Sequence, residues 1–251
     1  MSSNPPSQCC VAGVKHEGEP KGTIDKVGTH DAYIVYPSDK STENGIILFP
    51  DFMGYELINM KLLADQFAAN GYFTTIPDMW EGDNVPVNWK PGNGFNLGAW
   101  MGKHNPSKAG PIAEGVVKAM RQDYGVKKLG GVGYCLGAKY VLLHLASARR
   151  KGIDAGYIAH PTATTGEDIK AIDGPLSIAA AETDDLFPAS KRHETEEILK
   201  DMKVPYQISL YSDVEHGFAN KADLMNPRCK FATETAFLQA VNWFDEFVKK
   251  D

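Results

Sequence analysis

The chain has 251 residues, of which 43% are hydrophobic and 23% are charged, and its formal net charge is −6. This composition is typical of a globular protein and excludes disordered, collagen-like and disulfide-framework chains. A mildly acidic chain fits poorly with non-specific binding to nucleic acids or to anionic membranes, which requires clustered positive charge. We therefore expect neither of these as a partner.

Targeting signals and cysteine spacing indicate the cellular compartment and whether the chain binds a metal. No apolar run approaches the ~20 residues of a membrane-spanning helix, and the N-terminus lacks the basic start and apolar core of a secretory signal. The four cysteines, Cys9, Cys10, Cys135 and Cys229, match neither a disulfide framework nor a zinc pattern. We expect a cytoplasmic protein that needs no metal and no cofactor.

Residues 1–22 are rich in Pro, Ser and Gly and are predicted to form an N-terminal arm, with a single domain at 23–251. Within the domain, short apolar runs alternate with segments whose apolar residues recur every three or four positions, which predicts strands and helices. In chain order the predicted elements are strands at 32–36 and 45–49, a helix at 57–67, a strand at 72–76, a helix at 112–123, a strand at 129–132, a helix at 136–148, strands at 155–159 and 175–181, a helix at 189–200, a strand at 206–211 and a helix at 232–249. This order predicts an α/β fold with a mostly parallel central sheet and helices on both faces.

The segment 80–107 is rich in Asn, Gly, Pro and Trp and has no clear period. It follows the end of a strand, where ligands bind in such sheets, and a long irregular segment in a compact domain is usually functional. Alternatively, the aromatic residues of this segment pack as in any core, and its histidines have a structural or surface role. The candidates to line a substrate pocket in or near the carboxyl edge of the sheet are Trp80, Phe95, Trp100, His104, Tyr134 and His160.

A nucleophile motif lies between the strand at 129–132 and the following helix. Gly133-Tyr134-Cys135-Leu136-Gly137 matches the pattern G-x-S-x-G with Cys in place of Ser. The small glycines let strand and helix approach around a strained turn, and the helix N-terminus is expected to favour the reactive thiolate. The alternative is a buried structural cysteine between two packing glycines.

The other members of a catalytic triad should follow in the order acid, then histidine. Asp184 and Asp185 both come directly after the strand at 175–181, and either fits by position. His216 lies in the loop after the strand at 206–211, next to a glycine. His216 would take the proton of Cys135 or pair with its thiolate and would later activate water, while the Asp would orient the imidazole.

An oxyanion hole requires two backbone N–H donors. We expect one from Leu136, directly after the nucleophile, and the other from Phe52, in the loop after the third strand of the usual order. Asp51 is a carboxylate in the same loop. From the residues alone it is either a surface or helix-capping acid or a group of the active site.

These motifs resemble the dienelactone hydrolase (carboxymethylenebutenolidase) family of the α/β-hydrolase fold, from about Lys21 to the C-terminus. The resemblance is carried by the segments at 50–54, 76–80, 133–139, 181–188 and 215–219, and the Cys at the elbow is its specific part. Gln8-Cys9-Cys10 and the segment 100–104 resemble the eukaryotic, mainly fungal, branch.

The resemblance implies a triad of Cys135, Asp184 and His216. It prefers Asp184 because the acid of the family lies four residues before the proline that corresponds to Pro188. It also implies that Asp51 interacts with the resting thiol, a role that the family typically gives to the longer Glu.

The resemblance also predicts that the substrate of this chain differs from that of the bacterial members. Bacterial members hold a substrate carboxylate with two arginines, and Gly82 and Asn220 take their places here. Arginine's bidentate fork is hard to replace, although three lysines could serve as point charges: Lys103, Lys139 and Lys221. We therefore expect a natural substrate other than dienelactone.

The sequence thus predicts a monomeric or homodimeric hydrolase of lactones or small carboxylic esters, which forms a thioester acyl-enzyme on Cys135. Two alternatives stay open. One is a hydrolase of thioesters or other esters of secondary metabolism with the same triad. The other is a non-catalytic binding or thiol redox-sensing protein on the same scaffold.

Overall fold

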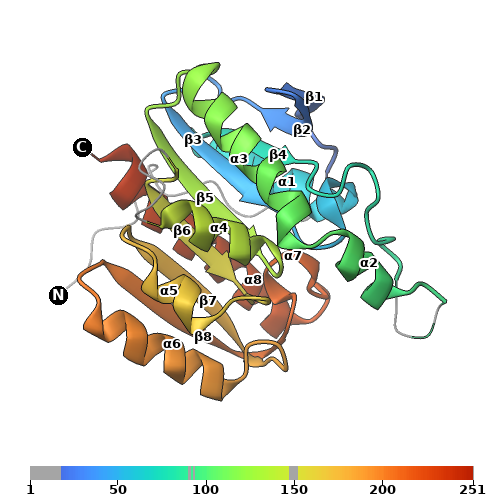
Figure 1. Ribbon diagram of the computed structural model, residues 1–251, viewed down its shortest axis with the longest axis vertical. Coiled ribbons are helices and arrows are strands. Elements are labelled where there is room, and N and C mark those ends of the chain that lie inside the picture. Colours follow the sequence, from blue (N-terminus) through green and yellow to red (C-terminus); the bar gives the residue numbers. More distant parts are fainter. Residues whose placement is uncertain (1–17, 90–91, 93, 147–151, 251) are drawn as a thin grey trace.

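The computed structural model describes residues 18–89, 92, 94–146 and 152–250. Eight strands form one sheet in the order β1-β2-β4-β3-β5-β6-β7-β8 (Figure 1). The strands are β1 (Thr23–Val27), β2 (His30–Val35), β3 (Asn44–Phe49), β4 (Phe73–Pro77), β5 (Lys128–Tyr134), β6 (Ala155–Ala159), β7 (Leu176–Thr183) and β8 (Tyr206–Glu215). Strand β2 is antiparallel to both of its neighbours, whereas β4, β3 and β5 to β8 are parallel, so the predicted mostly parallel sheet is confirmed.

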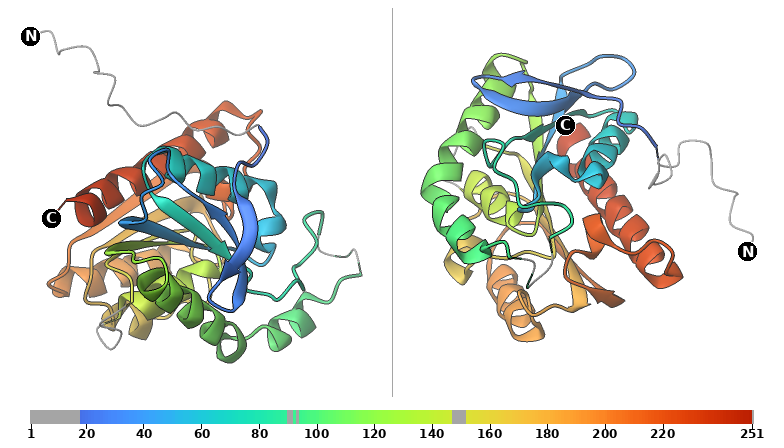
Figure 2. Two further views of the ribbon diagram at one scale, coloured as in Figure 1. Left: turned by 90° about the horizontal axis from the view of Figure 1, so that it is seen from above. Right: turned by 90° about the vertical axis from the view of Figure 1, so that its right-hand side faces the viewer.

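Helices cover both faces of this sheet, as Figure 2 shows with α1 and α8 on one side and α3 and α4 on the other. The longer helices are α1 (Ile58–Ala69), α3 (Pro106–Gln122), α4 (Gly137–Leu145), α6 (Ala189–Asp201) and α8 (Pro227–Phe244). Side chains of a strand alternate between the faces. In β3, Ile47 and Phe49 join the core under α3 and α4, while Ile46 and Leu48 join the core under α1 and α8.

The predicted elements are all present, but a short 3-10 helix (Gly54–Glu56) and four further strands and α-helices of the described residues were missed. The latter four are β1, α2 (Leu97–Lys103), α5 (Gly166–Lys170) and α7 (Phe218–Lys221). The segment 80–107 is therefore not wholly irregular: it contains α2, and α3 begins at Pro106 rather than near 112. Most of the predicted arm, including Cys9 and Cys10, lies outside the described residues.

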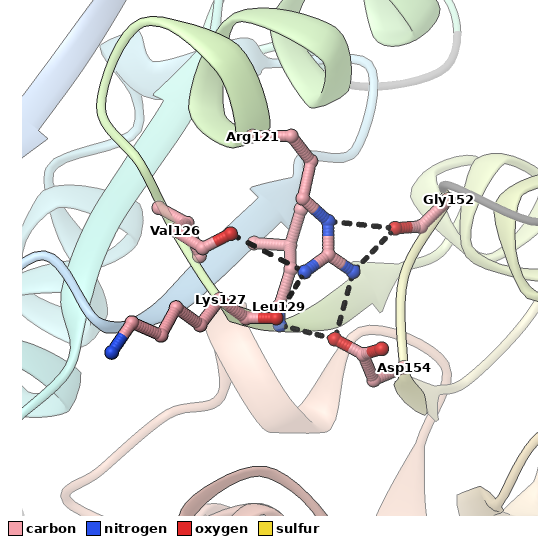
Figure 3. A network of polar contacts seen from close by, with 6 residues as sticks. All are labelled: Arg121, Val126, Lys127, Leu129, Gly152 and Asp154. Carbon is pink, nitrogen blue, oxygen red and sulfur yellow. Dashed lines mark hydrogen bonds and ion pairs between the residues drawn. The ribbon is translucent and has the colours of Figure 1, made fainter.

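Arg121 at the end of α3 ties three segments together at the start of β5 (Figure 3). Its guanidinium donates to the carbonyls of Gly152 and Lys127, at 2.8 and 2.7 Å, and to Asp154 Oδ2 at 2.7 Å. The same Asp154 oxygen accepts the backbone N–H of Leu129. This network anchors β5, the strand that leads to the nucleophile motif.

None of the helices in the described ranges combines the length and the apolar character that crossing a bilayer needs.

Candidate active site

Cys135 lies in a tight turn between β5 and α4, and its backbone φ is +53°. A residue other than glycine rarely adopts this left-handed region, because its Cβ is crowded there. Backbone hydrogen bonds hold the turn: Cys135 donates to Ala159, and its carbonyl accepts from Thr162 and Ala138, each at 3.2 Å. The predicted strained strand–turn–helix arrangement is thus present.

The two glycines of the motif are required by close backbone contacts. A Cβ on Gly137 would lie 2.0 Å from the carbonyl oxygen of Phe49, and a Cβ on Gly133 would lie 2.7 Å from Ala138. Both distances are too short for real atoms. The glycines therefore allow α4 to start directly against β3 and β5, which fixes the position of Cys135 at the carboxyl edge of the sheet.

Asp184 and His216 form a close pair at the same edge of the sheet. His216 Nδ1 lies 3.0 and 2.9 Å from the two carboxylate oxygens of Asp184. Burial raises the pKa of Asp184, but the bonds from His216 and from the backbone N–H groups of Phe187 and Leu186 outweigh it and leave the pKa below its usual value. Asp185 is exposed, so of the two acids only Asp184 contacts the imidazole.

The resting thiol is neutral, which corrects the expectation that the helix N-terminus favours the thiolate. Cys135 is 1% exposed. Its pKa is raised to about 12, chiefly by burial and next by the negative charge of Asp51. Lys221 and the backbone N–H of Leu136 lower the pKa but do not compensate. Desolvation of the charged form thus outweighs the partial charge of the helix end.

Asp51 follows β3 and is completely buried, with polar contacts that satisfy both carboxylate oxygens. Oδ1 accepts the backbone N–H of Met53 at 2.8 Å, and Oδ2 lies 3.0 Å from both Asn220 Nδ2 and Lys221 Nζ. The Trp80 indole donates to the Asp51 carbonyl at 2.9 Å. Asp51 is therefore a buried group near Cys135 rather than a surface acid, and its negative charge raises the pKa of the thiol.

The two residues predicted to supply oxyanion donors lie in the loops after β5 and β3. Leu136 is the N-cap residue of α4, and a hydrogen bond from its backbone N–H lowers the pKa of the Cys135 thiol. Phe52 packs edge-on against the ring of Trp89 at 5.8 Å, and Lys221 Nζ lies 4.6 Å from its ring centre.

His160, at the end of β6, lies against the imidazole of His216, with ring centres 4.9 Å apart. It is completely buried, and its φ is +38°. Burial, and next the proximity of His216, hold the pKa of His160 well below its usual value, so the ring is neutral. Tyr134 and Phe218 pack on the same ring at 5.9 Å.

Most of the other predicted pocket residues pack around Trp80, whose indole donates to the Asp51 carbonyl. Trp100 and His104 pack on Trp80, with ring centres 5.0 and 5.9 Å from it. Asp83 holds both, because its carbonyl accepts from the Trp100 indole and its Oδ2 lies 2.8 Å from His104 Nε2. Phe95 is partly buried against the same core. A pocket-lining role for these residues stays a prediction.

Only one of the three lysines considered as a replacement for arginine reaches the site. Lys103 pairs with Asp83, and Lys139 pairs with Asp168 through both carboxylate oxygens at 2.7 Å. Lys221 instead pairs with Asp51 and acts on the Cys135 pKa. In the described ranges, no group of three or more His, Cys, Asp or Glu side chains is arranged to hold a metal ion.

The arrangement matches known hydrolases in sequence and in fold. The model of the dienelactone hydrolase family matches residues 30–248. Hydrolase pyvD of Aspergillus violaceofuscus is 48% identical and Hydrolase tropI of Talaromyces stipitatus is 46% identical, and each alignment covers 100% of both chains. A solved structure titled as a putative dienelactone hydrolase of Klebsiella pneumoniae has a TM-score of 0.72 at 13% identity, over 87% of this chain and 93% of that one.

The chain therefore belongs to the dienelactone hydrolase family. Its fold is the α/β-hydrolase fold, and it is a hydrolase of esters or lactones. These findings confirm the resemblance, the fold class and the enzyme class predicted from the motifs.

Two residues of the site were not recognised from the sequence as partners of Asp51. Asn220 and Lys221 lie on α7, whose four residues are too few to show a helical period. Their signal in the sequence is their place four and five residues after His216, on the segment that leaves the histidine loop.

Proposed function

We propose that this protein hydrolyses a lactone or a small carboxylic ester, with Cys135 as nucleophile, His216 as base and Asp184 as the residue that orients it. No cofactor takes part. The observation that carries the proposal is the Asp184–His216 pair, bonded at 2.9 Å, on the same sheet edge as a cysteine in a strained turn at the start of a helix. These residues follow β5, β7 and β8 in the chain order that is typical of the α/β-hydrolase fold.

In the first half of the reaction, His216 Nε2 accepts the thiol proton as Cys135 Sγ attacks the carbonyl carbon. The backbone N–H groups of Leu136 and Phe52 stabilise the negative charge that develops on the carbonyl oxygen. The C–O bond to the leaving alcohol then breaks, and the alkoxide takes the proton from His216. The product is a thioester on Cys135, which water hydrolyses in the second half with His216 as base.

Asp51 restrains the resting nucleophile in this proposal. Its carboxylate opposes the formation of a second negative charge on Cys135, so the thiolate forms only when His216 removes the proton in the presence of a substrate. The raised thiol pKa supports this role. A neutral thiol also protects the enzyme from oxidation and alkylation between turnovers.

The buried, neutral thiol favours an enzyme over a redox sensor. Sensor cysteines are exposed and have a low pKa, whereas Cys135 is buried and its pKa is raised to about 12. A hydrolase of thioesters or of other esters of secondary metabolism would use the same triad, and a substrate panel distinguishes it from the leading proposal.

The test is a paired assay of the wild type and Cys135→Ala with p-nitrophenyl acetate, p-nitrophenyl butyrate and a dienelactone. We expect the wild type to turn over a nitrophenyl ester and Cys135→Ala to lose this activity by at least about 10³-fold, as expected for removal of a nucleophile. Weak or absent turnover of the dienelactone is expected because no arginine stands at 82 or 220. Equal activity of both proteins would refute the proposal.

A further inference from the structure

Buried polar atoms without a hydrogen-bond partner gather beside the candidate base. Within the described part of the chain, four such atoms belong to three neighbouring side chains: His160 Nδ1 and Nε2, His216 Nε2 and Asn220 Oδ1. Buried polar atoms are nearly always paired, and an unpaired group in a native protein requires an explanation. Ordinary packing does not explain why they concentrate at this one place.

These three side chains are in mutual reach. The imidazoles of His160 and His216 meet nearly perpendicularly, with ring centres 4.9 Å apart and an interplanar angle of 73°. The Asn220 side chain is close enough to His160 to raise its pKa against the effect of burial. The unpaired atoms therefore lie close to one another beside the ring of His216.

The orientation of Asn220 is fixed by its other neighbour. Asn220 Nδ2 donates to Asp51 Oδ2 at 3.0 Å. The carbonyl oxygen of this amide is consequently an acceptor with no bond in the described residues. Asn220 thus contributes an acceptor, and only an acceptor, to this group of unpaired atoms.

His160 contributes a donor and is held rigidly. As a neutral imidazole it carries one N–H and one lone pair. Its backbone N–H donates to Ala179 at 2.9 Å, and its φ of +38° is a conformation that a side chain other than glycine occupies only when its surroundings impose it. This places strain at a residue that the triad itself does not use.

A donor on His160 and acceptors on Asn220 and His216 match the needs of one water molecule, which takes two to four polar partners when buried. We propose that His160 and Asn220 hold the water molecule that His216 activates to hydrolyse the acyl-enzyme. This inference rests on the proposed function and assigns His160 as a water-positioning catalytic residue.

Hydrolysis of the acyl-enzyme consumes one water molecule and returns Cys135 to its thiol form. His216 Nε2 accepts one proton of the water, and the water oxygen bonds to the thioester carbonyl carbon. The C–S bond then breaks, Cys135 Sγ leaves with its electron pair, and the proton returns from His216 to the sulfur. The carboxylic acid is released. His160 and Asn220 undergo no net change, and they act by orienting the water oxygen toward the carbonyl carbon.

The test follows the two half-reactions separately by stopped-flow with p-nitrophenyl acetate. His160→Phe keeps a ring of similar shape against His216 but removes both ring nitrogens. We expect deacetylation to slow by about 100-fold, the scale of a misplaced reacting group, while acetylation proceeds near the wild-type rate. A burst of p-nitrophenol stoichiometric with enzyme should appear, and intact-protein mass should show one acetyl group on Cys135.

Two further measurements separate water positioning from a structural role. His160→Gln keeps a donor and an acceptor and should recover part of the deacetylation rate. Hydroxylamine, which attacks thioesters without an activated water, should restore turnover of His160→Phe. The control is Phe218→Leu, which removes a ring 5.9 Å from His160 but no polar atom and should show no burst.

The outcomes also separate this inference from the proposed function. Equal loss of acetylation and deacetylation in His160→Phe, with no acetyl group on Cys135, would overturn the inference and leave His160 as a packing residue. If Cys135→Ala is inactive but His160→Phe deacetylates at the wild-type rate, the inference alone fails. If Cys135→Ala is as active as the wild type, the proposed function fails.

Discussion

Asp184 holds His216 with both of its carboxylate oxygens, at 3.0 and 2.9 Å from Nδ1. Oδ1 also accepts the backbone N–H groups of Leu186 and Phe187, at 2.8 and 3.0 Å, so the carboxylate cannot turn away from the ring. An ionised Asp184 keeps the proton of His216 on Nδ1, and Nε2 is left as the proton acceptor. The loop after β7 therefore determines the chemistry of a residue on the loop after β8.

Asp184→Asn tests this relationship. The amide can present its N–H₂ group to Nδ1 and so favour the wrong tautomer of His216. We expect kcat to fall by about 10⁴-fold, as for a comparable change in the serine protease triad, with a smaller change in KM. The matched control is Asp185→Asn, because the neighbouring acid is exposed and should leave kcat unchanged.

The same pair gives a prediction for stability against pH. The pKa of Asp184 is below its usual value in the folded protein, so its ionised form stabilises the fold at pH values above about 4. This contribution is lost as the pH falls through the folded pKa. The difference in unfolding free energy between wild type and Asp184→Asn, from urea titrations, should therefore shrink below about pH 4. A difference that is constant from pH 3 to 7 would contradict the assignment.

Asp51→Asn should make Cys135 more acidic. Asp51 is the largest electrostatic cause of the raised thiol pKa, and its removal also leaves Lys221 without its partner at 3.0 Å. Both changes favour the thiolate. The rate of iodoacetamide alkylation, followed by mass spectrometry on the peptide that contains Cys135, should rise at neutral pH. Its pH midpoint should move below the wild-type value of about 12.

Asp31→Asn is the control for that experiment, because Asp31 is exposed and pairs with Lys26 at the surface. It should leave the alkylation rate of Cys135 unchanged. Unaltered alkylation in Asp51→Asn would show that burial alone sets the reactivity of the thiol.

Gly137→Ala should destabilise the fold at the active site. The added Cβ would lie 2.0 Å from the Phe49 carbonyl oxygen, and the backbone of Phe49 and Pro50 leaves it no room. We expect a loss of about 3 kcal/mol in the free energy of unfolding. Gly102→Ala in α2 is the control: its Cβ meets no atom within 4 Å, and it should be neutral or stabilising by up to about 1 kcal/mol. Thermal and urea unfolding of the two variants measure the contrast.

Arg121→Lys should lower stability without changing the chemistry. The single ammonium group of a lysine cannot replace the planar guanidinium, which bonds to Gly152, Lys127 and Asp154 together. We expect a loss of about 2 kcal/mol, in the range for a broken, partly buried network, and an unchanged kcat per folded molecule. Lys26→Gln removes only an exposed pair and should change stability by less than about 0.5 kcal/mol.

The fold could be predicted where strands are buried on both faces. β3, β5, β6 and β7 are largely apolar runs, and these have a strong signal because nearly all of their positions are buried. β1 was missed because four of its five residues are exposed. α2 and α7 were missed because seven and four residues give too little periodicity, and their side chains are placed by tertiary contacts.

The residues of the site that belong to local sequence motifs could be predicted. Gly133, Cys135 and Gly137 have a fixed spacing with a steric reason, and His216 and Asp184 follow strand ends. The protonation state of Cys135 could not be predicted, since it depends on burial and on Asp51, which is 84 positions away in the chain. The bond between Asp51 and Asn220 spans 169 positions, and no local pattern encodes such a contact.

The turn at Cys135 has a consequence for how this enzyme could change its chemistry. Its unusual backbone angle and its three hydrogen bonds involve only main-chain atoms, and the neighbouring glycines remove steric conflict without touching the sulfur. The backbone thus fixes the position of the nucleophile, whereas the side chain at position 135 supplies only the attacking atom. A lineage, or an engineer, can exchange sulfur for oxygen at position 135 by a single substitution while the scaffold around it stays the same.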